Sequence, residues 1–270
     1  MTFPPGFRRT QTVDQADGLR RLFSARSVRF IPVVANPFVA DQAALTGRLC
    51  AALEDLRLYT LLVDASGAGT GPSWHRPEGG WHGLASRVEV LTDRIARLAV
   101  PEWAVSATPE ALQALTEVAP LSQAVLVQGS ATVLAALFGL SGRVLSRPRP
   151  IVVCDAREES VKHAYGELKT LVRRADWRGY NVLMSADEGA PAAWHVPGRL
   201  AQCAERFLGG VMHDCVSMAP SMPVTLRSAE LLAGFMESSL DAAAAFVLPD
   251  AGVHAAVAPK ATSRHLQPVI

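Results

Sequence analysis

Residues 28–64 constrain the fold more than any other part of the chain. Residues 28–35 (VRFIPVVA) and 59–64 (YTLLVD) are apolar runs rich in β-branched side chains, and residues 41–56 between them have apolar positions at helical spacing. Two apolar strands joined by a helix of this length form a βαβ unit, whose strands lie parallel in one sheet. The sequence therefore predicts an α/β protein built on a parallel sheet.

Short apolar runs continue to alternate with helical segments along the chain. Further strands are predicted at residues 124–127, 151–154, 180–184 and 211–218. Helices are predicted at residues 88–100, 109–118, 131–138, 158–174, 194–208 and 226–246. This alternation is typical of a doubly wound, mainly parallel sheet, in which ligands bind at the carboxyl ends of the strands.

Length and composition predict one large domain, or one domain with a small appendage. The chain has 270 residues, of which 49% are hydrophobic, enough for one sizeable α/β core. We assign residues 28–248 to this domain, residues 1–27 to an N-terminal arm and residues 249–270 to a loose C-terminal tail.

Several function classes are disfavoured by composition. The net charge of +1 gives no field for nucleic acid, and no apolar run reaches the ~18 residues of a membrane span. The N-terminus lacks the apolar stretch of a secretory signal. The four cysteines are widely spaced and form no C-x-x-C pair, which indicates reduced thiols in a cytoplasmic protein. His75 and His82 each follow a tryptophan, but with no third ligand nearby they predict no metal site.

Residues 12–25 (TVDQADGLRRLFSA) are predicted to form a short amphipathic helix. Thr12 and Gln15 have the spacing of a capping box. An apolar stripe is formed by Val13, Ala16, Leu19, Leu22 and Phe23. A helix docked on its own domain would explain these features, but it would not call for Gly18, which costs ~1 kcal/mol in a helix interior. Asp14, Gln15 and Arg20 together favour contact with a partner protein.

The segment DQADGLRRL resembles the DQAxGLR signature of the flagellar-number regulators of the MinD/ParA family (FlhG or FleN type). Weaker similarities follow in the family's order, including LLVDAS, IVVCDAREESVKHAYGELKTL and RLAQCAERFL, and cover most of residues 12–220. The resemblance implies a MinD-like P-loop NTPase fold whose N-terminal extension helix stimulates FlhF, the flagellar GTPase of the signal-recognition-particle type. The partner-binding residues that it implies are Asp14, Gln15, Ala16, Gly18, Leu19, Arg20 and Arg21.

The family's phosphate loop, KGGxGK[ST], is not preserved. By position, Pro37 replaces its first Lys, Val39 replaces a Gly and Asp41 replaces its last Gly. Gln42 replaces its second Lys, and Ala43 replaces its Ser/Thr. Two cations and a hydroxyl are lost, and a carboxylate stands where phosphates would lie, which repels them by several kcal/mol even at an effective dielectric constant of ~20.

Two other elements of the family's nucleotide site are also replaced. Gln128 stands where a strand would deliver an Asp to the metal, and Ser185 or Ala186 stands in place of the asparagine that reads adenine. Asp64 survives, but without its lysine and metal partners we favour the interpretation that it is a polar strand end that caps the next turn. Because phosphoryl transfer depends on positioning and charge neutralisation, we predict a pseudo-ATPase without catalytic residues, metal or cofactor.

Three functions remain to be weighed. The first is a non-catalytic regulator of flagellar number or placement that stimulates FlhF. It does not dimerise when ATP is present and is therefore a monomer. The second is an active MinD/ParA-type ATPase switch with an atypical nucleotide loop. The third is an unrelated α/β enzyme that uses Asp64, Asp155 and the two histidines.

The partners and localisation of this regulator are implied by the resemblance, and its membrane binding is predicted from the charge pattern. Partners are FlhF and, as a further option, flagellar basal-body components, with polar localisation through the partner. Relatives end in a membrane-targeting helix, but residues 226–246 carry one basic residue, Arg227, so weak or no membrane binding is predicted.

Overall fold

The computed structural model describes residues 27–67, 80–101, 111–139, 147–187 and 189–247, with backbone only at residues 80–83 and 247. The predicted partner-binding residues 14–21, the tail and His75 lie outside the described residues. The boundaries predicted for the arm and the tail stay predictions.

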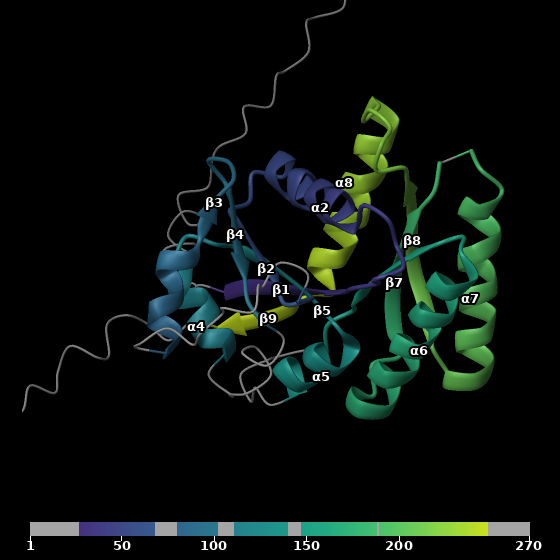
Figure 1. The fold of residues 1–270 in the computed structure, drawn as a ribbon, viewed down its shortest axis with the longest axis horizontal. Helices are drawn as coiled ribbons and strands as arrows, with labels where there is room; N and C mark the ends of the chain where they lie inside the picture. The colour runs from purple at the N-terminus through teal and green to yellow at the C-terminus, as the bar shows by residue number, and fades with distance from the viewer. Residues whose placement is uncertain (1–26, 68–79, 102–110, 140–146, 188, 248–270) are drawn as a thin grey trace, which may run out of the picture. The chain divides into compact units, whose positions relative to one another are not determined.

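The described residues form one mixed, mainly parallel sheet (Figure 1). Its strands are β1 (Ser27–Val34), β2 (Thr60–Asp64), β3 (Glu89–Val90), β4 (Ile95–Ala99), β5 (Ala124–Gly129), β6 (Ile151–Asp155), β7 (Gly179–Ser185), β8 (Val211–Met218) and β9 (Ala244–Val247). Eight strands lie in the order β3-β4-β2-β5-β1-β6-β7-β8, and β9 pairs with β1. Only the β3/β4 and β1/β9 pairs are antiparallel, so the predicted fold class is confirmed.

Helices cover both faces of the sheet. They are α2 (Gln42–Asp55), the 3₁₀ helix η1 (Gly80–Arg87), α4 (Ala111–Val118), α5 (Ala131–Gly139), α6 (Glu158–Ala175), α7 (Ala192–Leu208) and α8 (Leu226–Asp241). On one face α2 packs against α8, and on the other α5 packs against α6 and α6 against α7 (Figure 1). A buried apolar cluster between the sheet and the α2/α8 layer includes Ile31, Leu45, Leu126 and Met236. None of the described helices combines the length and apolar character needed to cross a membrane.

The order of the strands places a switch point beside β1. From β1 the chain passes through α2 to β2 on one side of the sheet, and from β5 it passes through α5 to β6 on the other. In open α/β sheets the crevice at the carboxyl ends of such neighbouring strands is where ligands bind. The loop after β1 and the start of α6 therefore frame the site to be examined.

Pro32 lies in the middle of the central strand, where a missing N–H group is normally costly. Arg29 N and Ala35 N both donate to β5 or the residue before it, so odd-numbered residues of β1 face β5 and Pro32 faces the opposite side. On that side β9 pairs with residues 27–30 and β6 with residues 33–34. Pro32 thus falls between the two partners, where no donor is required.

The helix predicted at residues 88–100 is wrong, because this stretch forms β3, a turn and β4. Its apolar residues fit a helix, but the Thr92 hydroxyl accepts hydrogen bonds from the backbone of Arg94 (3.2 Å) and Ile95 (3.1 Å), which stabilises a turn instead. The following residues then pair in parallel with β2, with Thr60 opposite Ile95. The open edge of β2 decided the conformation.

The helix predicted at residues 226–246 ends early, at Asp241, and the chain returns as β9. The alanines at 242–245 suggested a continuous helix. However, β6 pairs with β1 only at Val33 and Val34, which leaves the first half of β1 with an open edge. β9 fills it, and Phe246 packs edge-on against Phe30 with ring centroids 6.0 Å apart.

Candidate functional site

The carboxyl edge of β1 leads into the loop at which the family's phosphate cradle would lie. Pro37, Asp41 and Ala43 are exposed, and Gln42 is half-buried at the first position of α2. Asp41 adopts a left-handed conformation (φ 55°), and its side chain does not cap the helix. This loop runs from Asn36 to Asp41 and contains neither glycine nor lysine.

Asn36 anchors the loop to β6 and α6. Its side chain is 1% exposed, and its Nδ2 lies 3.0 Å from each of three acceptors: Val153 O, Ser160 O and Ser160 Oγ. The same Ser160 hydroxyl oxygen accepts the N–H of Asp155 at 3.0 Å. Because Ser160 is fully buried, the hydrogen bonds that join the β1 loop to β6 and α6 are shielded from water.

The loop and the first residue of α2 also supply acceptors to the backbone of the loop. Gln42 Oε1 accepts the N–H of Asn36 at 2.6 Å, and Asn36 Oδ1 accepts the N–H of Phe38 at 3.1 Å. The N–H of Val39 donates to Asn36 O at 3.0 Å. In a phosphate-binding loop such N–H groups point at the ligand. Here side-chain and carbonyl oxygens of the loop occupy these three donors.

A chain of hydrogen bonds continues from α2 across the strand ends. The Thr46 hydroxyl donates to Gln128 Oε1 (2.6 Å), and its oxygen lies 3.0 Å from Gln42 O. Gln128 Nε2 lies 3.4 Å from Ser66 Oγ, which in turn donates to Asp64 Oδ1 at 2.6 Å. The structure thus brings Gln42, Gln128 and Asp64 together, as candidate positions of one site.

The charges at these strand ends are engaged with one another. Arg97 from β4 pairs with Asp64 (3.0 Å), which leaves the Asp64 side chain 11% exposed. At the end of β6, Arg157 pairs with Asp155 (2.7 Å). Arg48 of α2 donates instead to the carbonyls of Pro220 and Met222 in the loop before α8. The exposed carboxylate of Asp41 therefore sits at the start of α2 while these three cations are held elsewhere.

The two carboxylates of the alternative enzyme hypothesis are not brought together. β2 and β6 are three strand positions apart in the sheet, which corresponds to ~14 Å at ~4.8 Å per strand. Asp64 and Asp155 each have their own arginine. Among the described residues, no three His, Cys, Asp or Glu side chains are grouped so as to hold a metal ion.

The strand end proposed to have lost the adenine-reading asparagine is closed by backbone bonds. The N–H of Ala186 lies 3.1 Å from Met184 O and 3.2 Å from Met218 O, and Ser185 pairs with Met218 across β7 and β8. Glu158 and Glu159 lie in the first turn of α6, where the helix dipole favours anions. They need no ligand to explain them.

Sequence reasoning assigned no role to the residues that hold the site closed, namely Asn36, Thr46, Ser66, Arg97 and Ser160, although Asn36 and Ser66 lie at the strand ends where a ligand is expected. Ser66 had a local signal, since Asp-x-Ser after a strand is typical of an Asx turn, and the N–H of Ser66 does bond to Asp64 Oδ1 (3.2 Å). Arg97 had none, because its segment was predicted as a helix. Its partner became apparent only when β4 was placed beside β2.

Comparison with known proteins supports the fold. The sequence matches no protein-family model and no curated protein. A plasmid partition protein from Borrelia burgdorferi aligns with a TM-score of 0.51 and 9% identity, over 78% of this chain and 99% of that one. A putative plasmid partition protein from B. burgdorferi B31, bound to AMPPNP, aligns with a TM-score of 0.51 and 10% identity, over 79% and 98% of the two chains.

The MinD cell division protein of Aquifex aeolicus aligns more weakly, with a TM-score of 0.46 and 14% identity, over 78% of this chain and 87% of that one. At these identities the likeness concerns the fold alone. With the strand order and the βαβ units described above, the chain has the α/β fold of the MinD/ParA-like P-loop NTPases.

Proposed function

We propose that this protein is a non-catalytic regulator with a MinD/ParA-like fold, which binds and stimulates the flagellar GTPase FlhF through its N-terminal DQADGLRRL segment. In this proposal the sheet domain is a rigid support, and the site at the end of β1 binds no nucleotide. Flagellar number or placement is the process that it regulates.

The observation that carries the proposal is the self-contained hydrogen bonding of the loop after β1. Asn36 and Gln42 occupy loop N–H groups that a phosphate would need, and the side chain of Asn36 is buried against Val153 and Ser160. Nucleotide binding would have to break these bonds and overcome the charge of Asp41 without a lysine from the loop. The intact signature at residues 14–22 supports the choice of partner.

The test is GTP hydrolysis by the cognate FlhF with and without the full-length chain. We expect stimulation, and we expect Gln15→Ala and Arg20→Ala to abolish it. Gln11→Ala and Arg26→Ala are matched controls outside the signature and should retain it. No stimulation by the full-length protein, or equal stimulation by all four variants, would refute this role of the segment.

The alternative is an active ATPase switch with an atypical nucleotide loop. It is favoured by one observation, that a fold neighbour is bound to AMPPNP. Titration calorimetry with ATP and Mg²⁺ separates the two. Our proposal predicts no binding heat and no change of sedimentation coefficient with ATP, whereas saturable binding or ATP-dependent dimerisation would favour the switch.

A further inference from the structure

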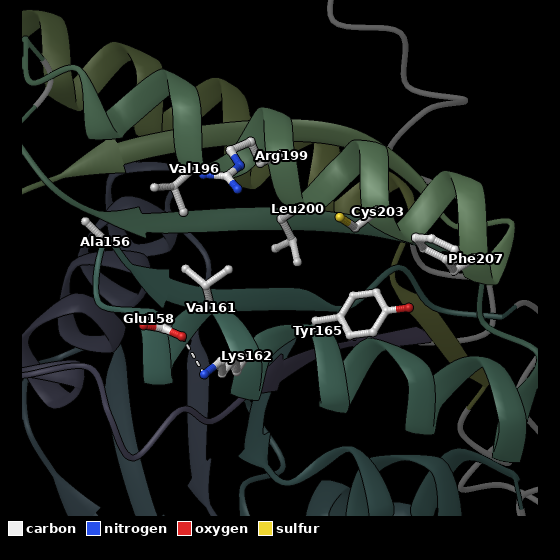
Figure 2. Close-up of a pocket in the computed structure, with 10 residues that line it drawn as sticks. All are labelled: Ala156, Glu158, Val161, Lys162, Tyr165, Val196, Arg199, Leu200, Cys203 and Phe207. Atoms are coloured by element: carbon white, nitrogen blue, oxygen red, sulfur yellow. Dashed lines mark ion pairs between the residues drawn. The ribbon is translucent and has the colours of Figure 1, made fainter.

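A groove with a volume of about 720 Å³ runs between α6 and α7 (Figure 2). α6 contributes Val161 and Tyr165 to it, and α7 contributes Val196, Leu200 and Phe207. These residues recur at spacings of three to seven, so each helix turns one continuous face towards the groove. Figure 2 shows the side chains of the two helices on opposite sides of it.

The groove has the dimensions of a helix. Its α7 side extends from Val196 to Phe207, which lie eleven positions apart, and this corresponds to ~16 Å or roughly three helical turns. The groove is open to solvent at its Phe207 end, where this side chain is 66% exposed, whereas Leu200 at its floor is 2% exposed. A small-molecule site encloses most of its ligand. An open apolar groove between two helices is instead suited to the apolar face of a third helix.

The charge of the groove specifies one feature of the occupant. Three charged side chains line it: Glu158, Lys162 and Arg199. Glu158 and Lys162 neutralise each other in an ion pair of 2.5 Å. Among the described residues Arg199 has no ion-pair partner, and it lies in the middle of the α7 face (Figure 2). The lining therefore carries one uncompensated positive charge within an apolar surface.

We propose that the groove between α6 and α7 binds an amphipathic helix of a partner protein, with an acidic residue of that helix facing Arg199. The apolar stripe of the partner helix covers Val161, Tyr165, Leu200 and Phe207, and its carboxylate forms an ion pair with the Arg199 guanidinium. The proposal is independent of the role of the N-terminal segment.

Two synthetic peptides test this proposal on the full-length protein. Each is a 14-residue amphipathic helix with blocked ends and leucines at helical spacing, and the two differ only in a Glu or a Lys beside the leucine stripe. Binding is followed by fluorescence anisotropy of the labelled peptide. A second readout is the rate at which iodoacetamide alkylates Cys203, which lies in the groove.

Cys203 is a selective probe because it is the exposed one of the four cysteines. Burial raises the pKa of the Cys50 and Cys154 thiols to about 12 and that of Cys215 to about 11, which lowers the fraction of reactive thiolate at these three residues near neutral pH. Alkylation of the native protein therefore reports on the groove, and Cys203→Ser is the blank.

We expect the Glu peptide to bind at least tenfold more tightly than the Lys peptide and to slow alkylation of Cys203. Phe207→Ser should weaken binding about tenfold, and Arg199→Glu should reverse the preference between the peptides. Trp194→Ser removes another exposed aromatic of α7 that does not line the groove, and it should change neither readout. Failure of both peptides to bind, or an unchanged preference in Arg199→Glu, would overturn the proposal.

Discussion

The loop after β1 and the groove between α6 and α7 differ in how far their side chains are already engaged by contacts within the chain. In the loop, Asn36 and Gln42 bond to neighbouring backbone and side-chain atoms, and the anchoring Asn36 is buried. In the groove, Phe207 is largely exposed and Arg199 has no ion-pair partner among the described residues. The loop is closed by contacts within the chain, whereas the groove exposes side chains that a partner could contact.

This difference indicates that binding of a further molecule is more favourable at the groove than at the loop. A ligand at the loop must replace buried hydrogen bonds, each of which leaves an unsatisfied group when it is broken. A helix at the groove replaces only water over apolar surface and supplies the missing charge. Substitutions in the loop should therefore reduce stability, and substitutions in the groove should reduce binding.

The largest effect is expected for Asn36→Leu. Leucine has a similar size but leaves Val153 O and both Ser160 acceptors without the amide donor, which should lower the free energy of unfolding by about 2–4 kcal/mol. Urea unfolding measures it, with Gln202→Leu at an exposed position of α7 as the control. If Asn36→Leu cost no more than this control, the loop would not be held closed by Asn36.

A smaller effect is expected for Thr46→Val and Gln128→Leu. Each removes one partner of the buried 2.6 Å bond and should cost about 1–2 kcal/mol. Because the other partner is then already unpaired, the double variant should cost less than the sum, with a coupling of about 1 kcal/mol. A double-mutant cycle in urea measures this coupling. Strict additivity would mean that the two side chains do not act as a unit.

The smallest effect on stability is expected for Phe207→Ser in the groove. The side chain is already 66% exposed, so the free energy of unfolding should change by no more than about 0.5 kcal/mol. Thermal and urea unfolding of this variant sharpen the comparison with Asn36→Leu. A loss of 2 kcal/mol or more would place the groove residues in the structural core instead of on a binding surface.

Much of the fold could be predicted because local pattern and tertiary structure agree. The apolar runs at β1, β2, β5, β6, β7 and β8 are strands, and the helices α2, α4, α5, α6 and α7 between them lie close to the predicted boundaries. The stretch at residues 88–100 could not be assigned in this way, since its apolar spacing fits either state. The edge of β2, supplied by a distant part of the chain, selected the strand.

In the candidate site, too, some residues could be predicted from the sequence and others could not. The candidate positions were found from a resemblance in order along the chain, namely Pro37, Asp41, Gln42, Ala43, Asp64 and Gln128. Three of them, Gln42, Asp64 and Gln128, lie in one hydrogen-bonded chain. Their partners Thr46, Ser66 and Arg97 were given no role from the sequence. A serine or threonine in a helix or turn is common, and only proximity in space gives it a role.

The sequence by itself determined the alternation of strands and helices and the chemistry of the β1 loop, because both depend on residue types and spacings along the chain. Tertiary structure alone decided that β9 returns to the open half of β1, that Arg97 meets Asp64, that Asn36 is anchored to Ser160, and that α6 and α7 leave a groove between them. These features arise from pairings between segments tens to hundreds of residues apart, which local patterns do not encode.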